Sequence, residues 1–213
     1  MKLIAINGGP RKEWNTATLL KHAMDGAKSK GADTELIHLY DLNFKGCTSC
    51  FACKTKGGKS FGKCAMQDGL TPVLEKIAQA DALVVGSPIY LGSTTGETRS
   101  FLERLIFQYL QYTNPPSTTA PRKIRTAFIY TMNVTQEQMD IMKYQYHFDL
   151  VSGGMQRNFG SHEALYSFDT MQFEDYEKFV APRFDAEAKR KRHEEVFPQD
   201  CMAAFELGAR LLS

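Results

Sequence analysis

The sequence has no hydrophobic run that approaches the roughly 20 residues of a membrane-spanning helix. Its first residues, MKLIAINGG, lack the long apolar stretch and the small-residue cleavage site of a secretory signal peptide. These absences argue against a membrane protein and against export. We therefore expect a cytoplasmic protein with no membrane partner.

The sequence also lacks an excess of charge of either sign, because 26 Lys and Arg residues face 24 Asp and Glu residues and leave a net charge of +2. Such a balance creates no field strong enough to attract nucleic acid. The one basic run, KRKRH at 189–193, is flanked by glutamates and has no aromatic ladder, so we interpret it as a solvated helix face. We expect a small-molecule partner and no nucleic acid.

No set of side chains typical of acid–base or hydrolytic catalysis stands out. The five histidines show no paired spacing, and His193-Glu194-Glu195 lacks the second histidine of a zinc-protease helix. A catalytic triad and a carboxylate pair are also missing. Any enzymatic role then depends on what the chain can bind.

What the sequence does contain is an alternation of apolar, strand-like segments with amphipathic, helical ones. Several strand-like segments are almost continuously apolar, as in parallel strands buried on both faces. Alternation of this kind implies right-handed crossovers, so we predict an α/β fold: a doubly wound five-stranded parallel sheet in a three-layer α/β/α sandwich. The predicted strands are 2–7, 34–40, 82–87, 124–131 and 162–168, and the predicted helices are 16–30, 98–112, one after Pro72 and one after Pro198.

Length and composition favour a single domain over residues 1–213. Three segments interrupt the alternation: a Cys-rich insert at 44–69, a Pro-Pro loop at 113–122 and a C-terminal extension at 171–195 before the last helix. The extension spaces aromatic residues among charged ones, which suggests an arm that packs on another subunit. We therefore expect a homodimer or a higher homo-oligomer.

The turn after the first strand, GGPRKEWNT at 8–16, has features of an anion site. In doubly wound sheets this turn offers backbone N–H groups and a helix N-terminus to a phosphate. Its glycines permit a close approach, Arg11 adds a charged fork, and Asn15 or Thr16 can cap the helix while bonding phosphate oxygens. The turn matches neither GxGxxG nor a Walker loop, which disfavours a dinucleotide or ATP.

A second loop, SPIYLGSTTG at 87–96, follows the third apolar strand. Its apolar side chains are costly to expose unless something flat and apolar covers them, as a ring system would. A phosphate turn and a ring-binding loop at the same edge of a sheet describe a mononucleotide site. Flavin mononucleotide (FMN) fits this description best.

The segments GGPRKEWNT, SPIYLGSTTGETRSFLER and FPQDCMAAFELGARLL resemble the phosphate turn, the flavin-ring loop and the closing helix of the flavodoxin-like NAD(P)H-dependent FMN reductases. The resemblance covers most of 1–132, is weak over 133–195 and returns at 196–212. Gly9 stands where that family usually has serine. The resemblance implies FMN as cofactor and NAD(P)H as electron donor. The cofactor-binding residues that it implies are Gly9, Pro10, Arg11, Asn15 and Thr16 at the phosphate, Pro88, Ile89, Tyr90, Leu91 and Gly92 at the ring, and Thr131, Met132 and Asn133 on the other side of the ring.

Four of the five cysteines, Cys47, Cys50, Cys53 and Cys64, form the pattern C-x2-C-x2-C-x10-C. Thiolates at such tight spacing can converge on an iron–sulfur cluster or a zinc ion. The motif GCTSCFACK resembles that of the iron–sulfur flavoproteins, a branch of the same flavodoxin-like family, although here the fourth cysteine lies farther along the chain. A [4Fe-4S] cluster, zinc, and free or redox-active thiols are three alternatives that the pattern leaves open.

Bound FMN would carry the difficult chemical step, because it accepts hydride from a nicotinamide and passes electrons onward. No catalytic side chain is then required, and we expect none. The sequence thus predicts an NAD(P)H-dependent FMN oxidoreductase that reduces a small acceptor such as a flavin, a quinone or another electrophile. The alternative is an iron–sulfur flavoprotein that carries electrons between protein partners.

Overall fold

A computed structural model describes residues 1–213 and is built around one mostly parallel sheet. Five parallel strands follow the order β2-β1-β3-β7-β8, and a short β4 pairs antiparallel with the end of β3. The predicted five-stranded, doubly wound sheet is confirmed, and its strand order is that of flavodoxin-like folds. The strands are β1 Lys2–Asn7, β2 Asp33–His38, β3 Ala82–Tyr90, β4 Ser93–Thr94, β7 Ile124–Thr131 and β8 Gly160–Ser167.

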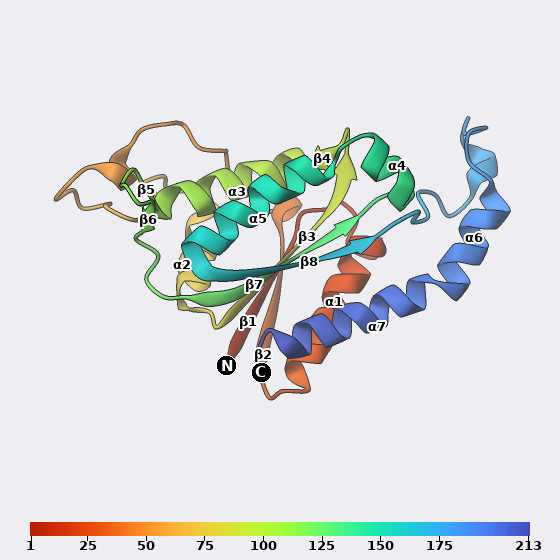
Figure 1. Cartoon of the computed structure of the whole chain (residues 1–213), viewed down its shortest axis with the longest axis horizontal. Coiled ribbons are helices and arrows are strands. Elements are labelled where there is room, and N and C mark those ends of the chain that lie inside the picture. The colour runs from red at the N-terminus through yellow and green to blue at the C-terminus, as the bar shows by residue number, and fades with distance from the viewer.

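Helices cover both faces of this sheet and complete the predicted three layers (Figure 1). Helices α1 (Asn15–Lys28) and α7 (Phe197–Arg210) cover one face, and α2 (Thr71–Gln79), α3 (Gly96–Tyr109) and α5 (Gln145–Phe159) cover the other. Side chains alternate between the two faces of a strand. Leu3 and Ala5 of β1 therefore join the core under α1 and α7, while Ile4 and Ile6 join the core under the other helices.

Several elements were not predicted from the sequence. The segment between β7 and β8 contains α4 (Gln136–Ile141) before α5. In the C-terminal extension the run at 189–193 was expected to be helical, and it lies within a longer helix, α6 (Ala186–Glu195). The Pro-Pro loop forms a hairpin from β5 (Leu110–Gln111) and β6 (Ser117–Thr118). None of the helices is both long enough and apolar enough to cross a membrane. Three short 3₁₀ turns complete the description: η1 Leu39–Asp41, η2 Ala52–Lys54 and η3 Tyr176–Lys178.

The strand register brings the predicted ligand loops to one edge of the sheet. Asn7 at the end of β1 lies opposite Gly86 of β3, and the ladder continues with Gly8 N donating to Gly86 O at 2.8 Å. Farther along, Pro88 of β3 pairs with Thr131, which in turn pairs with Ser167 of β8. The carboxyl ends of four strands therefore meet where doubly wound folds bind their ligands.

Candidate functional site

A cavity of about 230 Å³ lies at this edge, and residues from all three predicted loops line it. Leu91 and Gly92 are predicted site residues that do not line it. They form the tip of the β3–β4 hairpin, where both have left-handed φ angles and the Leu91 side chain is fully exposed. The predicted residues that the structure brings together are Gly9, Pro10, Arg11, Asn15, Thr16, Pro88, Ile89, Tyr90, Thr131, Met132 and Asn133.

Close packing against α3 fixes the turn after β1. A side chain at Gly8 would place its Cβ 1.8 Å from Thr98 Oγ1, so only glycine fits there. The Thr95 hydroxyl donates to Gly8 O at 2.6 Å and accepts from Thr98 N, and so also caps α3. At Gly9 a Cβ would lie 3.1 Å from Pro88 Cδ. The glycine at this position is consistent with the nearness of the ring loop.

The N-terminus of α1 is open towards the cavity, because no side chain caps it. The prediction that Asn15 or Thr16 caps this helix is wrong, since both lie inside its first turn and their side chains have other partners. Asn15 Nδ2 donates to Met171 O at 2.8 Å, and Thr16 Oγ1 is 2.7 Å from Thr131 Oγ1. The first N–H groups of a helix have no intrahelical acceptor, so they are available to an anion.

A fourth wall of the cavity comes from Thr170, Met171 and Gln172, just after β8. Arg11 NH1 donates to Gln172 O at 2.9 Å, and Trp14 Nε1 donates to Met171 O at 3.2 Å. Burial lowers the pKa of Arg11, although nearby Tyr90 and Glu174 oppose this shift. Sequence reasoning missed this wall. The available signal was the predicted strand at 162–168, whose carboxyl end had to reach the same edge.

The C-terminal extension folds back beside this wall within the same chain. The rings of Phe173 and Phe179 stack with centroids 4.0 Å apart, and Gln172 N donates to the hydroxyl of buried Tyr176. The expectation of a solvated helix face at 189–193 is wrong for Lys189, which is only 5% exposed. The reason is that its ammonium group donates hydrogen bonds to two turns that lie close in space, at Asn133 and Asp169.

A second small cavity, of about 20 Å³, is lined by Cys47, Cys50, Cys53 and Cys64 together with part of α3. All cysteines of the chain are unpaired, and no three His, Cys, Asp or Glu side chains are placed to hold a single metal ion. Ser49 and Phe51, on either side of Cys50, have left-handed φ angles of 54° and 55°. Such non-glycine strain concentrates at ligand-binding loops.

Helix α3 supplies buried hydrogen-bond donors to the cysteine cavity. Arg104 is 1% exposed; its Nε donates to Cys64 Sγ at 3.3 Å and its NH1 to Asp68 at 2.6 Å. Burial acts to raise the pKa of Asp68, but the hydrogen bonds from Arg104 and the Leu70 backbone, together with the charge of Arg104, lower that pKa overall. Arg104 NH2 and Gln108 Nε2 are buried without a partner. Four thiols and two unpaired donors around one apolar space fit an iron–sulfur cluster, whose sulfur atoms accept hydrogen bonds.

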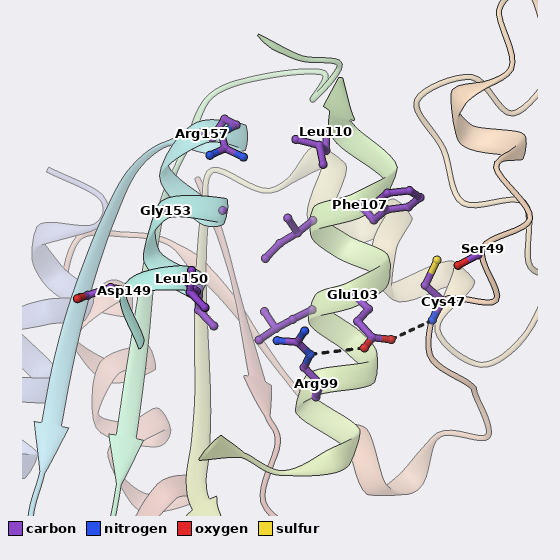
Figure 2. A pocket seen from close by; sticks show the side chains of 14 residues that line it. Cys47, Ser49, Arg99, Glu103, Phe107, Leu110, Asp149, Leu150, Gly153 and Arg157 are labelled. Carbon is purple, nitrogen blue, oxygen red and sulfur yellow. Dashed lines mark hydrogen bonds and ion pairs between the residues drawn. The ribbon is translucent and has the colours of Figure 1, made fainter. Parts of the chain in front are cut away.

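The largest hollow, about 640 Å³, is a groove between α3 and α5 (Figure 2). Its floor contains apolar side chains of both helices, and Gly153 opens it because a Cβ there would meet nothing within 4 Å. Arg99 pairs with Glu103 at 3.4 Å, and Glu103 accepts from Cys47 N at 3.3 Å, which ties the groove to the cysteine loop.

The curated relatives match about half of this chain. An iron–sulfur flavoprotein of Archaeoglobus fulgidus is 41% identical over 104 residues, which are 49% of this chain and 48% of that protein. One of Methanocaldococcus jannaschii is 35% identical over 104 residues, or 49% and 51% of the two chains. The chain thus matches only about half the length of these relatives.

Solved structures match the chain from end to end at low identity. An NAD(P)H:quinone oxidoreductase from Methanothermobacter marburgensis has a TM-score of 0.73 at 15% identity and covers 99% of this chain and 98% of its own. An FMN-dependent NADH-azoreductase from Bacillus anthracis, in complex with FMN, has a TM-score of 0.69 at 13% identity and covers 100% and 99%. These likenesses confirm the flavodoxin-like fold.

The sequence match to a family is more specific than the likeness in fold. The family model described as NADPH-dependent FMN reductase matches residues 1–123, which include the phosphate turn, the ring loop and the cysteine loop. Because the match extends over more than half of the chain, the protein belongs to the NADPH-dependent FMN reductase family.

Proposed function

We propose that the protein is an FMN-dependent oxidoreductase that takes hydride from NADPH or NADH and reduces a small acceptor such as a flavin, a quinone or another electrophile. The observation that carries this proposal is the cavity at the carboxyl ends of β1, β3 and β7, with an uncapped helix N-terminus on one side and apolar Pro88 and Ile89 on another. Family membership and the quinone- and azo-reductase names of the structural neighbours support it.

The residues of the cavity fit FMN in chemical character. The open N-terminus of α1, with Arg11 and the Thr16 hydroxyl beside it, would hold the phosphate. Pro88, Ile89 and the half-exposed Tyr90 would support the ring, and the turn at 131–133 would close its other side. Bound FMN supplies hydride and electron transfer, while these residues orient it and leave one face open.

An anaerobic titration tests this function. The purified protein should be yellow, and its flavin absorbance should bleach when NADPH or NADH is added and return with a quinone or free flavin. A protein that retains no flavin after incubation with FMN, or whose flavin bleaches with neither nicotinamide, would contradict the proposal. Its five unpaired cysteines suit a reducing compartment such as the cytoplasm, where we expect it to act.

A second candidate function, electron transfer between protein partners, is favoured by the cysteine cavity and by the names of the curated relatives. Cys47, Cys50, Cys53 and Cys64 would hold a [4Fe-4S] cluster, which would supply one-electron transfer. The cavity now has about the volume of one water molecule, so the loop would have to open to admit the cluster. Anaerobic purification should then give a brown protein with about four irons per chain. Iron content near zero would eliminate this function.

We also propose a homodimer that forms through the groove between α3 and α5. Support comes from the half-exposed Leu150 beside the open space at Gly153, which leaves room for a helix of a second copy. Two arginines, Arg99 and Arg157, and two acids, Glu103 and Asp149, line the groove, so a twofold-related copy could bring opposite charges together. Light scattering that gives a single-chain mass at all concentrations would contradict this proposal.

A further inference from the structure

Lys189 is the first residue of the basic run 189–193, and its ammonium group is buried although the sequence of this run is typical of a solvated helix face. It lies on α6, whose N-terminus Asp185 caps by accepting from Glu187 N and Ala188 N. Lys189 Nζ donates to Asn133 O at 2.8 Å, to Asn133 Oδ1 and to Asp169 Oδ1. An ammonium group has three N–H donors, so all of them are used. Its neighbours Arg190 and Lys191 are exposed.

The acceptors of Lys189 belong to the two turns that form the far side of the FMN cavity. Asn133 follows β7, and Asp169 follows β8 with a left-handed φ of 51°. These turns extend the β7–β8 ladder, since Asp169 N donates to Val134 O at 2.8 Å and Thr170 N donates to Met132 O at 3.0 Å. In Figure 1, α6 lies beyond the carboxyl ends of β7 and β8.

The same turns are connected to the phosphate side of the cavity. Asn133 Nδ2 donates to Gln172 Oε1 at 2.7 Å. The carbonyl groups of Met171 and Gln172 accept from Trp14, Asn15 and Arg11. A continuous set of hydrogen bonds therefore runs from Lys189 through the ring turn to the side chains at the phosphate turn.

We propose that Lys189 is a positioning residue of the flavin site: it fixes the turn at 131–133 and the segment 169–172 so that both stand at the correct distance from the phosphate turn. This inference rests on the proposed function, and it assigns a role to the C-terminal extension, which lies outside the family match over 1–123. A methionine at this position fills similar volume but leaves three acceptors without a donor. An arginine keeps the charge, but its planar fork does not place three donors at one point.

The test compares Lys189→Met, Lys189→Arg and the control Lys191→Met, each prepared as apoprotein and titrated with FMN. We expect the FMN dissociation constant of Lys189→Met to rise about tenfold or more, since buried acceptors lose their donor. At saturating FMN its visible circular dichroism should also differ from that of the wild type, because the ring turn has moved. Lys189→Arg should recover part of both properties, and Lys191→Met should match the wild type.

A folded Lys189→Met with wild-type affinity and an unchanged flavin spectrum would overturn the inference. If thermal unfolding shows that this variant does not fold, Asp169→Asn replaces it, because it weakens the same junction and keeps the volume. A raised FMN dissociation constant with an altered flavin circular dichroism spectrum would then support the inference, and wild-type values of both would overturn it. Failure of the proposed function looks different: a wild-type apoprotein that binds no FMN overturns that function and this inference together.

Discussion

At the scale of single residues, three side chains at the phosphate turn are held by backbone carbonyl groups. Arg11, Trp14 and Asn15 donate to carbonyl groups of the segment 171–172, and all three residues line the cavity. The Arg11 guanidinium also lies over the Trp14 ring, 4.5 Å from its centroid. Because a guanidinium carries five N–H donors, Arg11 can keep its bond to Gln172 O and still bind a phosphate oxygen.

Substitution of Arg11 should therefore weaken the binding of FMN but not that of riboflavin, which has no phosphate. For Arg11→Met we expect the FMN dissociation constant to rise about 10- to 100-fold, the usual effect of losing a hydrogen bond between charged groups. The riboflavin constant should change by no more than about twofold. Flavin fluorescence measures both constants. Lys12→Met is the control, since Lys12 is exposed and pairs with Asp41 on the surface; equal losses for the two flavins would show that Arg11 acts through folding instead.

His162 should make stability depend on pH. Burial lowers its pKa from 6.5 to about 4. Its Nδ1 lies 3.0 Å from Thr126 Oγ1, whose proton goes to Ser161 O, and its Nε2 is buried without a partner. Between pH 6.5 and pH 4 the His162 side chain is protonated in the unfolded chain but neutral in the folded one. The contribution of neutral His162 to the free energy of unfolding is therefore fully present above pH 6.5 and is lost as the pH falls towards 4.

Urea unfolding at pH 7 and pH 4.5 measures this contribution. The free energy of unfolding of the wild type should fall by on the order of 2 kcal/mol more than that of His162→Gln between these pH values. His147→Gln, at an exposed histidine, should behave as the wild type does. If the free energy of unfolding changed equally with pH in the wild type and in His162→Gln, His162 would not be the cause of the pH dependence.

The residues of the site were predictable where a turn has its own sequence signature. Gly9, Arg11 and Pro88 could be placed because glycine, arginine and proline each have a specific use in a ligand loop. Lys189 and Met171 could not, because their roles arise from partners more than 50 residues away: Lys189 reaches Asn133, and the Met171 carbonyl accepts from Asn15. Every residue, moreover, has the same backbone carbonyl group, so a carbonyl acceptor cannot be recognised from the residue type.

At the scale of elements, helices α1 and α7 pack backbone against backbone. A Cβ at Gly26 of α1 would lie 1.9 Å from Phe205 O, and a Cβ at Gly208 of α7 would lie 1.8 Å from Ala23 O. The two helix backbones therefore touch at a pair of glycines. This packing fixes α1 against the sheet and, with it, the helix N-terminus at the candidate phosphate site.

Alanine at Gly26 should destabilise the protein although it favours helix formation. Better propensity contributes about 1 kcal/mol, but separating the helices costs about 3 kcal/mol, so a net loss of about 2 kcal/mol is expected. Urea unfolding measures it. Gly96→Ala in the first turn of α3 is the control, because a Cβ there meets nothing within 4 Å and stability should not fall. An unchanged or raised stability in Gly26→Ala would show that the helices can separate without loss.

The predicted strands and helices follow the structure closely where the apolar pattern is strong. Strands β1 and β7 begin and end at the predicted residues, since every position of β1 after the first is buried. Helix α5 was missed because its inward side chains, among them Phe148, Val151 and Met155, are interrupted by Gly153 and Gly154. Helix α6 has few apolar residues, so tertiary contacts of Lys189 and not periodicity hold it in place.

At the scale of the whole molecule, α3 joins the two candidate redox sites. Its residue Thr98 contacts Gly8, next to the candidate FMN cavity, while Arg104 and Gln108 line the cysteine cavity. At a rise of 1.5 Å per residue, Thr98 and Arg104 are about 9 Å apart along the helix axis. One rigid helix thus sets the separation of the two sites. Its outer face meets α5 at the groove, so a second chain bound there would contact the element that carries both sites.

The substitution Leu150→Arg tests this arrangement, because Leu150 is 59% exposed and lines the groove. An arginine there would face a twofold-related copy of itself or bury its charge in apolar surface, and either is unfavourable at a dimer interface. We expect multi-angle light scattering to show a wild-type mass of twice 24.0 kDa and a Leu150→Arg mass of 24.0 kDa. Met202→Arg, at a 66% exposed residue of α7, should remain dimeric. Circular dichroism would confirm that both variants are folded. A dimeric Leu150→Arg would place the interface elsewhere, because a charged side chain in the centre of this groove leaves a second copy no apolar surface to cover.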